Sequence, residues 1–430
     1  MLFMKKLATY ELKLAFNMLA RIDSFYGIPA ISRTGYGLIS HSILLTAFVR
    51  VLSKKRFLVP ALFISNIALF MVSKYRIPSK GARIFCFAPT LNNVKSINRV
   101  THLLPDSVIH KASMGEKLSL VSKFRMACKL SVSISVAKII SRRVKDPYAI
   151  VQCLIAMNFF MLLRENVKLN QDDILLVSND HSPLPLALTF YYKRNYCKTC
   201  YVQHAPVSEY FPSLIFDLSI LHDIHSAQIY ENKPNKNLPR RGSVVIHPPF
   251  SDEFQGIRNL TYVNKVIGIC LGLTVNLPEL KRLIFWLGIQ PEINRVIVRL
   301  HPRSNGIDKE YWLMDKVIID KSNSFREFCS EIDCNIVGNS GVIIESLHFG
   351  CKTLYLSDLD FIEFDYYGFL EQGLIPEYQA ENLNDGRYFK NFYNDSWLDR
   401  YKKYDHTIGR SMLSIEKKVG NSLKKNLVDC

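Results

Sequence analysis

The chain has 430 residues, more than one hydrophobic core usually serves, so the sequence predicts two domains. Hydrophobic residues make up 48% and charged residues 22%, and this composition excludes an intrinsically disordered protein. The net charge of +17 lies entirely in the first third of the chain: residues 1 to 150 contain 24 basic and 5 acidic residues, against 31 and 33 in the remainder.

The first 80 residues form a basic, apolar region. Two uncharged runs, residues 34 to 49 and 57 to 73, have basic flanks and lie at or below the lower length limit for a membrane-spanning helix. We interpret them as helices on a membrane surface, with the basic residues facing anionic head groups. The alternatives are core helices of the first domain or a nucleic-acid face. We expect no nucleic acid, because the basic residues alternate with aliphatic runs and no groove-reading motif is visible.

The start of the chain and the cysteines indicate the compartment. The stretch MLFMKKLATYELKLAF is unlike a secretory signal, because Glu11 and Lys13 interrupt it and no small-residue cleavage site follows. The ten cysteines are irregularly spaced, several of them inside apolar runs, which is typical of reduced core thiols in the cytoplasm. The CKTC motif at 197 to 200 runs into a strand pattern and has no matching second ligand pair, so we predict structural thiols. We therefore expect a cytoplasmic protein, peripheral on the inner face of the membrane.

Past residue 80, short apolar strands alternate with helical patterns, which is typical of βαβ units and parallel sheets. In the first half we expect strands at 82–90, 173–180, 199–206 and 217–223, and helices at 115–143, 147–167 and 183–194. In the second half we expect strands at 265–274, 295–302, 316–320, 334–340 and 351–358, and helices at 277–288, 324–332 and 341–350.

A segment rich in turn formers, residues 247 to 264, separates the halves and is the predicted hinge. We divide the chain into the basic region 1–80, a first α/β domain 81–250, a second α/β domain 265–395 and C-terminal helices 396–430. Ligands of doubly wound sheets bind at the carboxyl ends of the strands, so the expected site is a cleft between the two domains.

Three features fall at strand ends of the second domain. Gly272 permits a tight turn, and Thr274 can donate to a phosphate. The second feature is the sequence His301-Pro302-Arg303, which follows a strand that also carries Arg299. Another His-Pro pair, at 247 and 248, we interpret as a chance occurrence.

The third feature is the sequence GNSGVIIESLHFG. We expect Asn339 or Ser340 to cap a helix that starts at Gly341, whose first-turn amides would form an anion site. Gly341 would let a ligand approach the backbone. Glu345, a little over one turn into the helix, is placed to accept both hydroxyls of a ribose.

The order of these features resembles the C-terminal half of the GT-B superfamily of glycosyltransferases. It is most similar to bacterial capsule and lipopolysaccharide enzymes that share an HP motif and a Ser/Thr-rich motif, the sialyltransferase and polysialyltransferase group. It also looks like the glycerophosphate transferases of teichoic acid synthesis and the UDP-N-acetylglucosamine 2-epimerases. The resemblance covers residues 265 to 357 and the first half in outline. It implies two Rossmann-like α/β domains facing a central cleft, with a C-terminal tail that crosses back to the first.

The resemblance also implies roles for the residues in these motifs. His301 would hydrogen-bond the donor phosphate and stabilise or protonate the leaving nucleotide. Ser340 and the adjacent amides would hold the same phosphate, and Glu345 would bind the ribose. Arg299 and Arg303 would supply positive charge.

An inverting transfer also needs a general base from the first domain. The candidates are Asp180 and His181 in VSNDHSPLP, and His204 with Glu209 in YVQHAPVSEYFP. The QHAPVSE segment resembles the QHG loop of capsule and teichoic acid transferases, which favours His204 for the acceptor side. The acidic pair followed by glycine that sialyltransferases carry is absent, and NDH is the nearest acidic feature.

Together these features predict an inverting, metal-independent glycosyltransferase without a cofactor. It would move a sugar from a nucleotide donor, with CMP-linked sialic acid-like or Kdo-like sugars among the candidates, to a capsule or lipopolysaccharide glycan or a lipid-linked acceptor. Two alternatives are a CDP-alditol phosphotransferase and a non-catalytic scaffold of a glycan assembly complex. The acidic run from 358 to 365 we interpret as a solvated loop rather than a metal site.

Overall fold

The computed structural model describes two α/β units. The described residues are 76–79, 81, 83–104, 112–117, 119, 121, 147–233, 242–250, 254, 256–258, 265–272, 275–301, 315–362, 364–405, 408 and 411–428. The apolar runs at 34–49 and 57–73, and nearly all of the helix expected at 115–143, lie outside them. Within the described ranges, no helix combines the length and the apolar character needed to cross a membrane.

The chain divides close to the predicted hinge. One unit ends at Pro249 and also includes residues 410 to 430, and the other runs from Phe250 to Gly409. Helix α17 (Asp395–Tyr404) therefore belongs to the second unit, and α18 (Met412–Leu423) belongs to the first.

The first unit contains a six-stranded parallel sheet in the order β3-β2-β5-β6-β7-β8. Its strands are β2 (Ile84–Phe87), β3 (Ala112–Ser113), β5 (Ile174–Val177), β6 (Lys198–Val202), β7 (Leu218–Leu221) and β8 (Ser243–Ile246). A separate antiparallel pair consists of β1 (Arg76–Ile77) and β4 (Glu116–Lys117). The strand order reverses between β2 and β5, so the topological switch point lies there.

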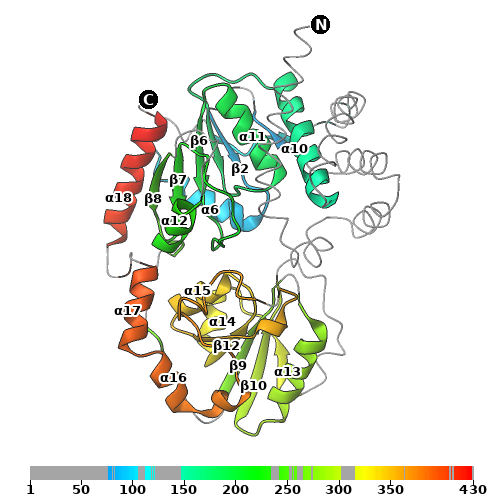
Figure 1. Cartoon of the computed structure of the whole chain (residues 1–430), viewed down its shortest axis with the longest axis vertical. Helices are drawn as coiled ribbons and strands as arrows, with labels where there is room; N and C mark the ends of the chain where they lie inside the picture. Colours follow the sequence, from blue (N-terminus) through cyan, green and yellow to red (C-terminus); the bar gives the residue numbers. More distant parts are fainter. Residues whose placement is uncertain are drawn as a thin grey trace. The chain divides into compact units, whose positions relative to one another are not determined.

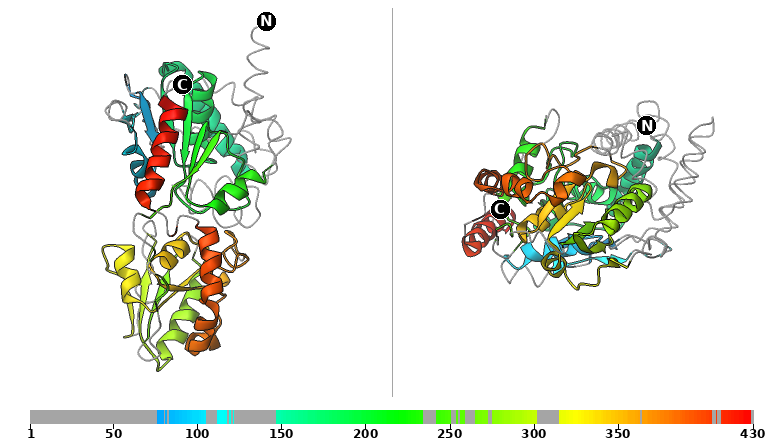
Figure 2. Two further views of the ribbon diagram at one scale, coloured as in Figure 1. Left: turned by 90° about the vertical axis from the view of Figure 1, so that its left-hand side faces the viewer. Right: turned by 90° about the horizontal axis from the view of Figure 1, so that it is seen from below.

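Helices cover both faces of this sheet (Figure 1). Helix α6 (Leu91–Thr101) and α18 pack on one face, where Ile97 and Val419 share a core with alternate strand residues. In both Figure 1 and Figure 2, α18 runs beside β8. A short helical segment, η4 (Lys424–Val428), follows α18. Helices α10 (Pro147–Asn166), α11 (Pro183–Arg194) and α12 (Ile224–Glu231) complete the unit, with α11 packed on β5, β6 and α10.

The second unit contains a five-stranded parallel sheet in the order β11-β10-β9-β12-β13. Its strands are β9 (Lys265–Cys270), β10 (Ile293–Arg299), β11 (Val317–Ile319), β12 (Cys334–Val337) and β13 (Lys352–Tyr355). Its helical segments are α13 (Leu277–Ile289), α14 (Phe325–Glu331), α15 (Val342–His348), η2 (Ser357–Leu359), η3 (Ala380–Asn384), α16 (Gly386–Phe392) and α17. One core joins the sheet to α13 and α16, and another joins it to α14, α15 and α17. The order reverses between β9 and β12.

The predicted fold class, two doubly wound α/β domains, is confirmed. The central strands are buried on both faces, which explains why the sequence shows uniform apolar runs rather than alternation. Several strands end two or three residues earlier than predicted, since the polar residues that follow Val177 and Val337 turn away from the ladder into loops.

The cysteines within the described residues are all free and buried. Cys200 lies in β6 and Cys197 directly before it, so the CKTC motif enters a strand as predicted. Burial raises the pKa of Cys197 to about 12, which keeps its thiol protonated and unreactive at neutral pH.

Candidate functional site

In the first unit, the loop after β5 holds Asp180 and His181 against each other. Oδ1 of Asp180 lies 2.9 Å from Nδ1 of His181, and Oδ2 accepts a hydrogen bond of 2.8 Å from the hydroxyl of Tyr230 on α12. Both residues are buried, Asp180 at 1% exposure and His181 at 7%. A carboxylate at Nδ1 fixes the proton there and puts the acceptor lone pair on Nε2. His181 therefore has the nitrogen suited to take a proton, whereas both oxygens of Asp180 are already engaged.

The backbone of this loop is held by the residue before the pair. Oδ1 of Asn179 accepts hydrogen bonds from the amides of His181 and Ser182, at 3.1 Å and 2.7 Å. Pro183 then begins α11, where a proline suits the first turn of a helix. The ring of His181 meets the ring of Phe211 edge-on at 5.0 Å. The position of the Asp180–His181 dyad is thus fixed both by the hydrogen bonds of its backbone and by the contact of the His181 ring.

His204 lies near this pair, two residues beyond the end of β6. Burial lowers its pKa to about 4, the His181 ring adds to the lowering, and Asp180 and the Ser178 carbonyl oppose it. A histidine with this pKa stays neutral at pH 7 and is a weaker base than one near 7. Glu209, the other predicted acceptor-side residue, is exposed farther along the same loop.

In the second unit, the loops after β9 and β12 meet at the switch point, and Asp360 lies between them. The Asp360 side chain is 2% exposed and accepts a hydrogen bond of 2.5 Å from the amide of Asn339. A Cβ on Gly338 would lie 2.1 Å from Oδ2 of Asp360, and a Cβ on Gly272 would lie 2.9 Å from Oδ1. Both glycines therefore make room for this carboxylate. The interpretation of the acidic run as a solvated loop was wrong for Asp360.

The start of α15 differs from the prediction. The helix begins at Val342, and Gly341 is its N-cap with a φ of −63°, an ordinary helical value. Asn339 does not cap it: the side-chain amide donates to the carbonyls of Ile362 and Phe364 at 2.9 Å each. The expected cap was wrong for Asn339, because its Oδ1, the atom that would cap the helix, accepts a hydrogen bond of 2.8 Å from the amide of Tyr366.

Ser340 precedes the start of α15 in the chain, and Glu345 lies in its first turn. Oγ of Ser340 accepts a long hydrogen bond of 3.4 Å from the amide of Val342. The helix is fastened to β12 by Asn335, whose side chain donates to Oγ of Ser346 at 2.8 Å. Glu345, next to Ser346, is half-buried.

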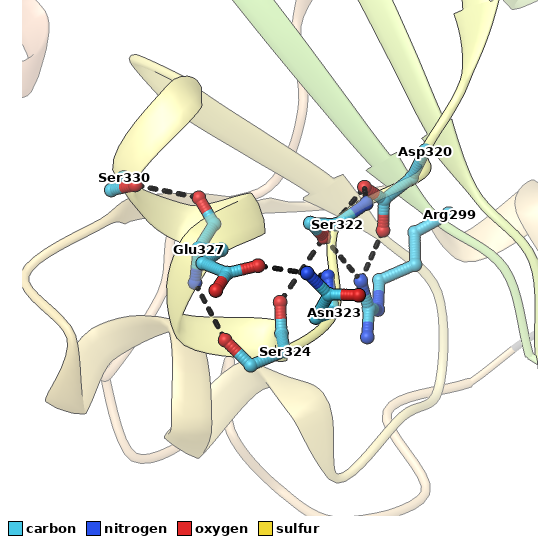
Figure 3. Close-up of polar contacts among 7 residues, drawn as sticks. All are labelled: Arg299, Asp320, Ser322, Asn323, Ser324, Glu327 and Ser330. Carbon is cyan, nitrogen blue, oxygen red and sulfur yellow. Dashed lines mark hydrogen bonds and ion pairs between the residues drawn. The ribbon is translucent and has the colours of Figure 1, made fainter.

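Arg299 is held by the end of the neighbouring strand β11 (Figure 3). Its Nη1 forms an ion pair with Asp320 and donates to Oγ of Ser322 at 2.9 Å. The guanidinium also lies 5.4 Å from the ring centre of Phe325 and 5.6 Å from that of Phe328. Its charge is thus largely balanced within the unit, and its role toward a phosphate stays a prediction.

His301 lies two residues beyond β10 and is half-buried, at the same sheet edge as the switch-point loops. The amide of Leu271 donates to the carbonyl of Arg299 at 3.0 Å, which ties the start of the β9 loop to the end of β10. The other predicted residues of this edge, Thr274, Pro302 and Arg303, lie outside the described residues.

Sequence reasoning missed Asp360 and Tyr230, because each acts on a loop far away in the chain. Tyr230 could have been found from the sequence as a residue of the helix that follows the strand DLSILHD. No local signal marks Asp360 among its acidic neighbours.

The fold defines a class: α/β proteins with two doubly wound units. No family model matches the sequence, and no curated protein matches it either.

Among solved structures, the chain is similar to the pneumococcal O-GlcNAc transferase GtfA in complex with UDP and GlcNAc. The identity is 13%, the TM-score is 0.38, and the match covers 65% of this chain but only 60% of GtfA. It is also similar to the S. aureus MnaA–UDP structure, with 15% identity, a TM-score of 0.40, and coverage of 64% and 79%. For the glycosyltransferase SnogD from Streptomyces nogalater, the identity is 10%, the TM-score 0.40, and the coverage 79% and 98%. These are distant likenesses in fold.

Proposed function

We propose that the chain is an inverting, nucleotide-sugar-dependent glycosyltransferase. The observation that carries the proposal is the buried Asp180–His181 dyad at the switch point of the first sheet. Ligands of doubly wound sheets bind at that point, and an oriented imidazole there is the arrangement a general base needs.

In the reaction, the acceptor hydroxyl oxygen attacks the anomeric carbon of the sugar. The bond between that carbon and the phosphate oxygen breaks, and the electron pair leaves with the nucleotide. Nε2 of His181 takes the hydroxyl proton, and Asp180 stabilises the imidazolium that forms. His301, at the strand-end edge of the second unit, hydrogen-bonds the departing phosphate, with Ser340 and Glu345 binding phosphate and ribose.

We further propose a CMP-linked donor, a surface glycan or lipid-linked acceptor, and docking of the basic N-terminal region on an anionic membrane. The transfer needs no divalent metal in this mechanism, because side chains alone stabilise the leaving phosphate. Turnover unchanged by EDTA is the expected result.

The test measures nucleotide release from CMP-, UDP- and GDP-sugars by the purified full chain. His181→Asn is expected to lower kcat by about 10²- to 10⁴-fold with little change in donor KM, because a base acts only in the transition state. His301→Ala is expected to lower kcat by about 10²- to 10³-fold, as for the loss of one donor to a developing oxyanion. His225→Ala, a histidine on α12 that is not in the dyad, is the matched control.

Unchanged turnover in both His181→Asn and His301→Ala would rule out the assignment. Phosphorus in the product would instead identify a CDP-alditol phosphotransferase. If no nucleotide raises the melting temperature, the chain is better described as a scaffold, because a ligand that binds only the folded state must stabilise it.

A further inference from the structure

Three histidines follow three neighbouring strands of the first sheet. His204 lies two residues beyond β6, and His222 and His247 directly follow β7 and β8. When the register of the two parallel ladders is continued past the strand ends, His204 lies opposite His222, and His222 lies opposite His247. The amide of His247 still donates to the carbonyl of Leu221 at 2.8 Å, so the last ladder does continue that far.

The three imidazoles belong to one face of the sheet. Side chains alternate along a strand, so residues two apart share a face. The residues two positions before the histidines are Val202, Ile220 and Val245, and all three lie in the core formed with α6 and α18. His222 is 8% exposed and His247 is 1% exposed. His222 and His247 are therefore buried next to α6.

Helix α6 carries a cation, Arg99, whose charge acts on His222 and His247. Nε and Nη2 of Arg99 are buried and make no hydrogen bond within the described part of the chain, and none of the ion pairs found there involves Arg99. Burial lowers the pKa of Arg99 to about 10. Burial, and after it the charge of Arg99, lower the pKa of both His222 and His247. The guanidinium is thus close enough to act on both rings.

Several buried nitrogens of this cluster lack hydrogen-bond partners. Nε2 of His222 has no hydrogen-bond partner among the described residues, while the other side of the ring contacts the Gln203 carbonyl. The backbone of Pro248 and that of His247 itself raise the pKa of the His247 ring and so oppose the lowering by burial, but neither ring nitrogen has a hydrogen-bond partner in the described ranges. Buried polar groups nearly always have partners, so this concentration of unpaired nitrogens needs an explanation.

We propose that Arg99, His222 and His247 bind a phosphoryl group, either a phosphate monoester or free phosphate. The dianion has three or more terminal oxygens for these donors, and the edge of a guanidinium that carries Nε and one Nη binds two of them side by side. A carboxylate has only two oxygens to offer. A metal cation would be repelled by Arg99, and no group of three metal-ligating side chains is found in the described residues.

Binding is coupled to proton uptake. At neutral pH the two histidines are neutral, because burial and Arg99 hold their pKa values low. A dianion between them favours the imidazolium, whose two nitrogens are both donors. The other groups around these rings are His204 after β6, His102 at the end of α6, and Glu416 on α18, which lies 3.8 Å from His102.

The site does not rest on the proposed transfer reaction, so it is tested without any sugar nucleotide. Isothermal titration calorimetry on the full chain at pH 7 uses three probes: inorganic phosphate, farnesyl phosphate and CMP. Two phosphate-free buffers with different ionisation enthalpies give the number of protons taken up. We expect binding with uptake of about one proton per phosphate. Tighter binding of farnesyl phosphate points to a lipid source of the group, and tighter binding of CMP points to a nucleotide.

Variants separate a binding role of Arg99 from a structural one. Arg99→Met is expected to weaken phosphate binding by about tenfold or more, since charge-assisted hydrogen bonds are lost. Because the variant also removes a buried, unpaired charge, its melting temperature without phosphate is expected to equal or exceed that of the wild type. His247→Gln is expected to reduce the proton uptake. Lys95→Met, an exposed cation one turn earlier on α6, is the matched control and leaves binding unchanged.

The proposal is overturned if none of the three probes binds, or if Arg99→Met and Lys95→Met weaken binding equally. It is also overturned if Arg99→Met lowers the melting temperature while Arg99→Lys, which keeps the charge but not the planar fork, binds phosphate as the wild type does.

Discussion

Lowering the pH from 7 to 5 in a phosphate-free buffer is expected to destabilise the first unit through two histidines, His204 and His247. Burial lowers the pKa of His204 to about 4, with the His181 ring adding to the effect, and it lowers the pKa of His247 to about 4, with Arg99 adding to the effect. An unfolded histidine has a pKa of about 6.5, so the unfolded chain binds these protons first. The stabilisation is therefore complete above about pH 6.5 and is lost as the pH falls toward 4.

The size of the effect follows from the two pKa values. For one histidine that titrates at about 6.5 unfolded and about 4 folded, the free energy of unfolding falls by about 2 kcal/mol between pH 7 and pH 5. Two such histidines that titrate independently contribute about 4 kcal/mol, a large share of the roughly 5–15 kcal/mol that stabilises a typical protein.

Hydrogen exchange read by mass spectrometry is the suitable assay. The three tryptophans, at positions 286, 312 and 397, all belong to the second unit, so fluorescence does not report on the first. Peptides from β6 and β7 should lose protection at pH 5 after correction for the intrinsic exchange rate. Peptides from β9 and β12 serve as the internal comparison.

The variant His247→Gln carries the test further, since glutamine does not titrate. It should lose about half of the pH dependence in β6 and β7. An undiminished pH dependence in this variant, or none in the wild type, would refute the reasoning.

Three further predictions concern other parts of the molecule. Asp180→Asn should lower the transfer rate by about 10²- to 10⁴-fold at unchanged donor KM, because the imidazole loses the carboxylate that orients it; rates of Tyr230→Phe close to wild type would confirm that the effect comes from His181. Gly338→Ala should destabilise the second unit by about 1–3 kcal/mol in urea unfolding followed by tryptophan fluorescence, because the added methyl group would overlap Asp360; an unchanged unfolding midpoint would contradict this overlap. Iodoacetamide should leave Cys197 unmodified in the native chain at pH 8 and modify it after unfolding, as read by mass spectrometry; rapid native labelling would contradict the burial that raises its pKa.

Much of the fold could be predicted from local pattern. The helix predicted at 183–194 has those same bounds in the structure, because proline at its start and basic residues at its end are local signals. The predicted strands were placed correctly but drawn too long, whereas strands β3 and β8 and helices α6 and α12 were not predicted. The apolar residue Leu271 follows the last residue of β9, whereas polar residues follow Val177 of β5, so hydrophobicity alone does not show where pairing stops.

The candidate site was predicted less completely. Asp180, His181 and His204 were found because each follows an apolar strand, but the choice of a base required the contact between Asp180 and His181 and the burial of His204. Arg299 was also found from the sequence, but its ion pair with Asp320 was not, because the two residues belong to the ends of two different strands.

The sequence by itself determined the two doubly wound units, the region between them and the strand ends that carry polar side chains, because strand and helix periods and turn residues act over a few neighbouring positions. Only the tertiary structure decided that Asp360 lies against Gly272 and Gly338, and that the charge of Arg99 acts on His222 and His247. These partners come from distant strands and helices, and the order and register of the sheets bring them together. The His-Pro pair at 247 and 248, interpreted from the sequence as a chance occurrence, thus contributes His247 to the cluster that also contains Arg99 and His222.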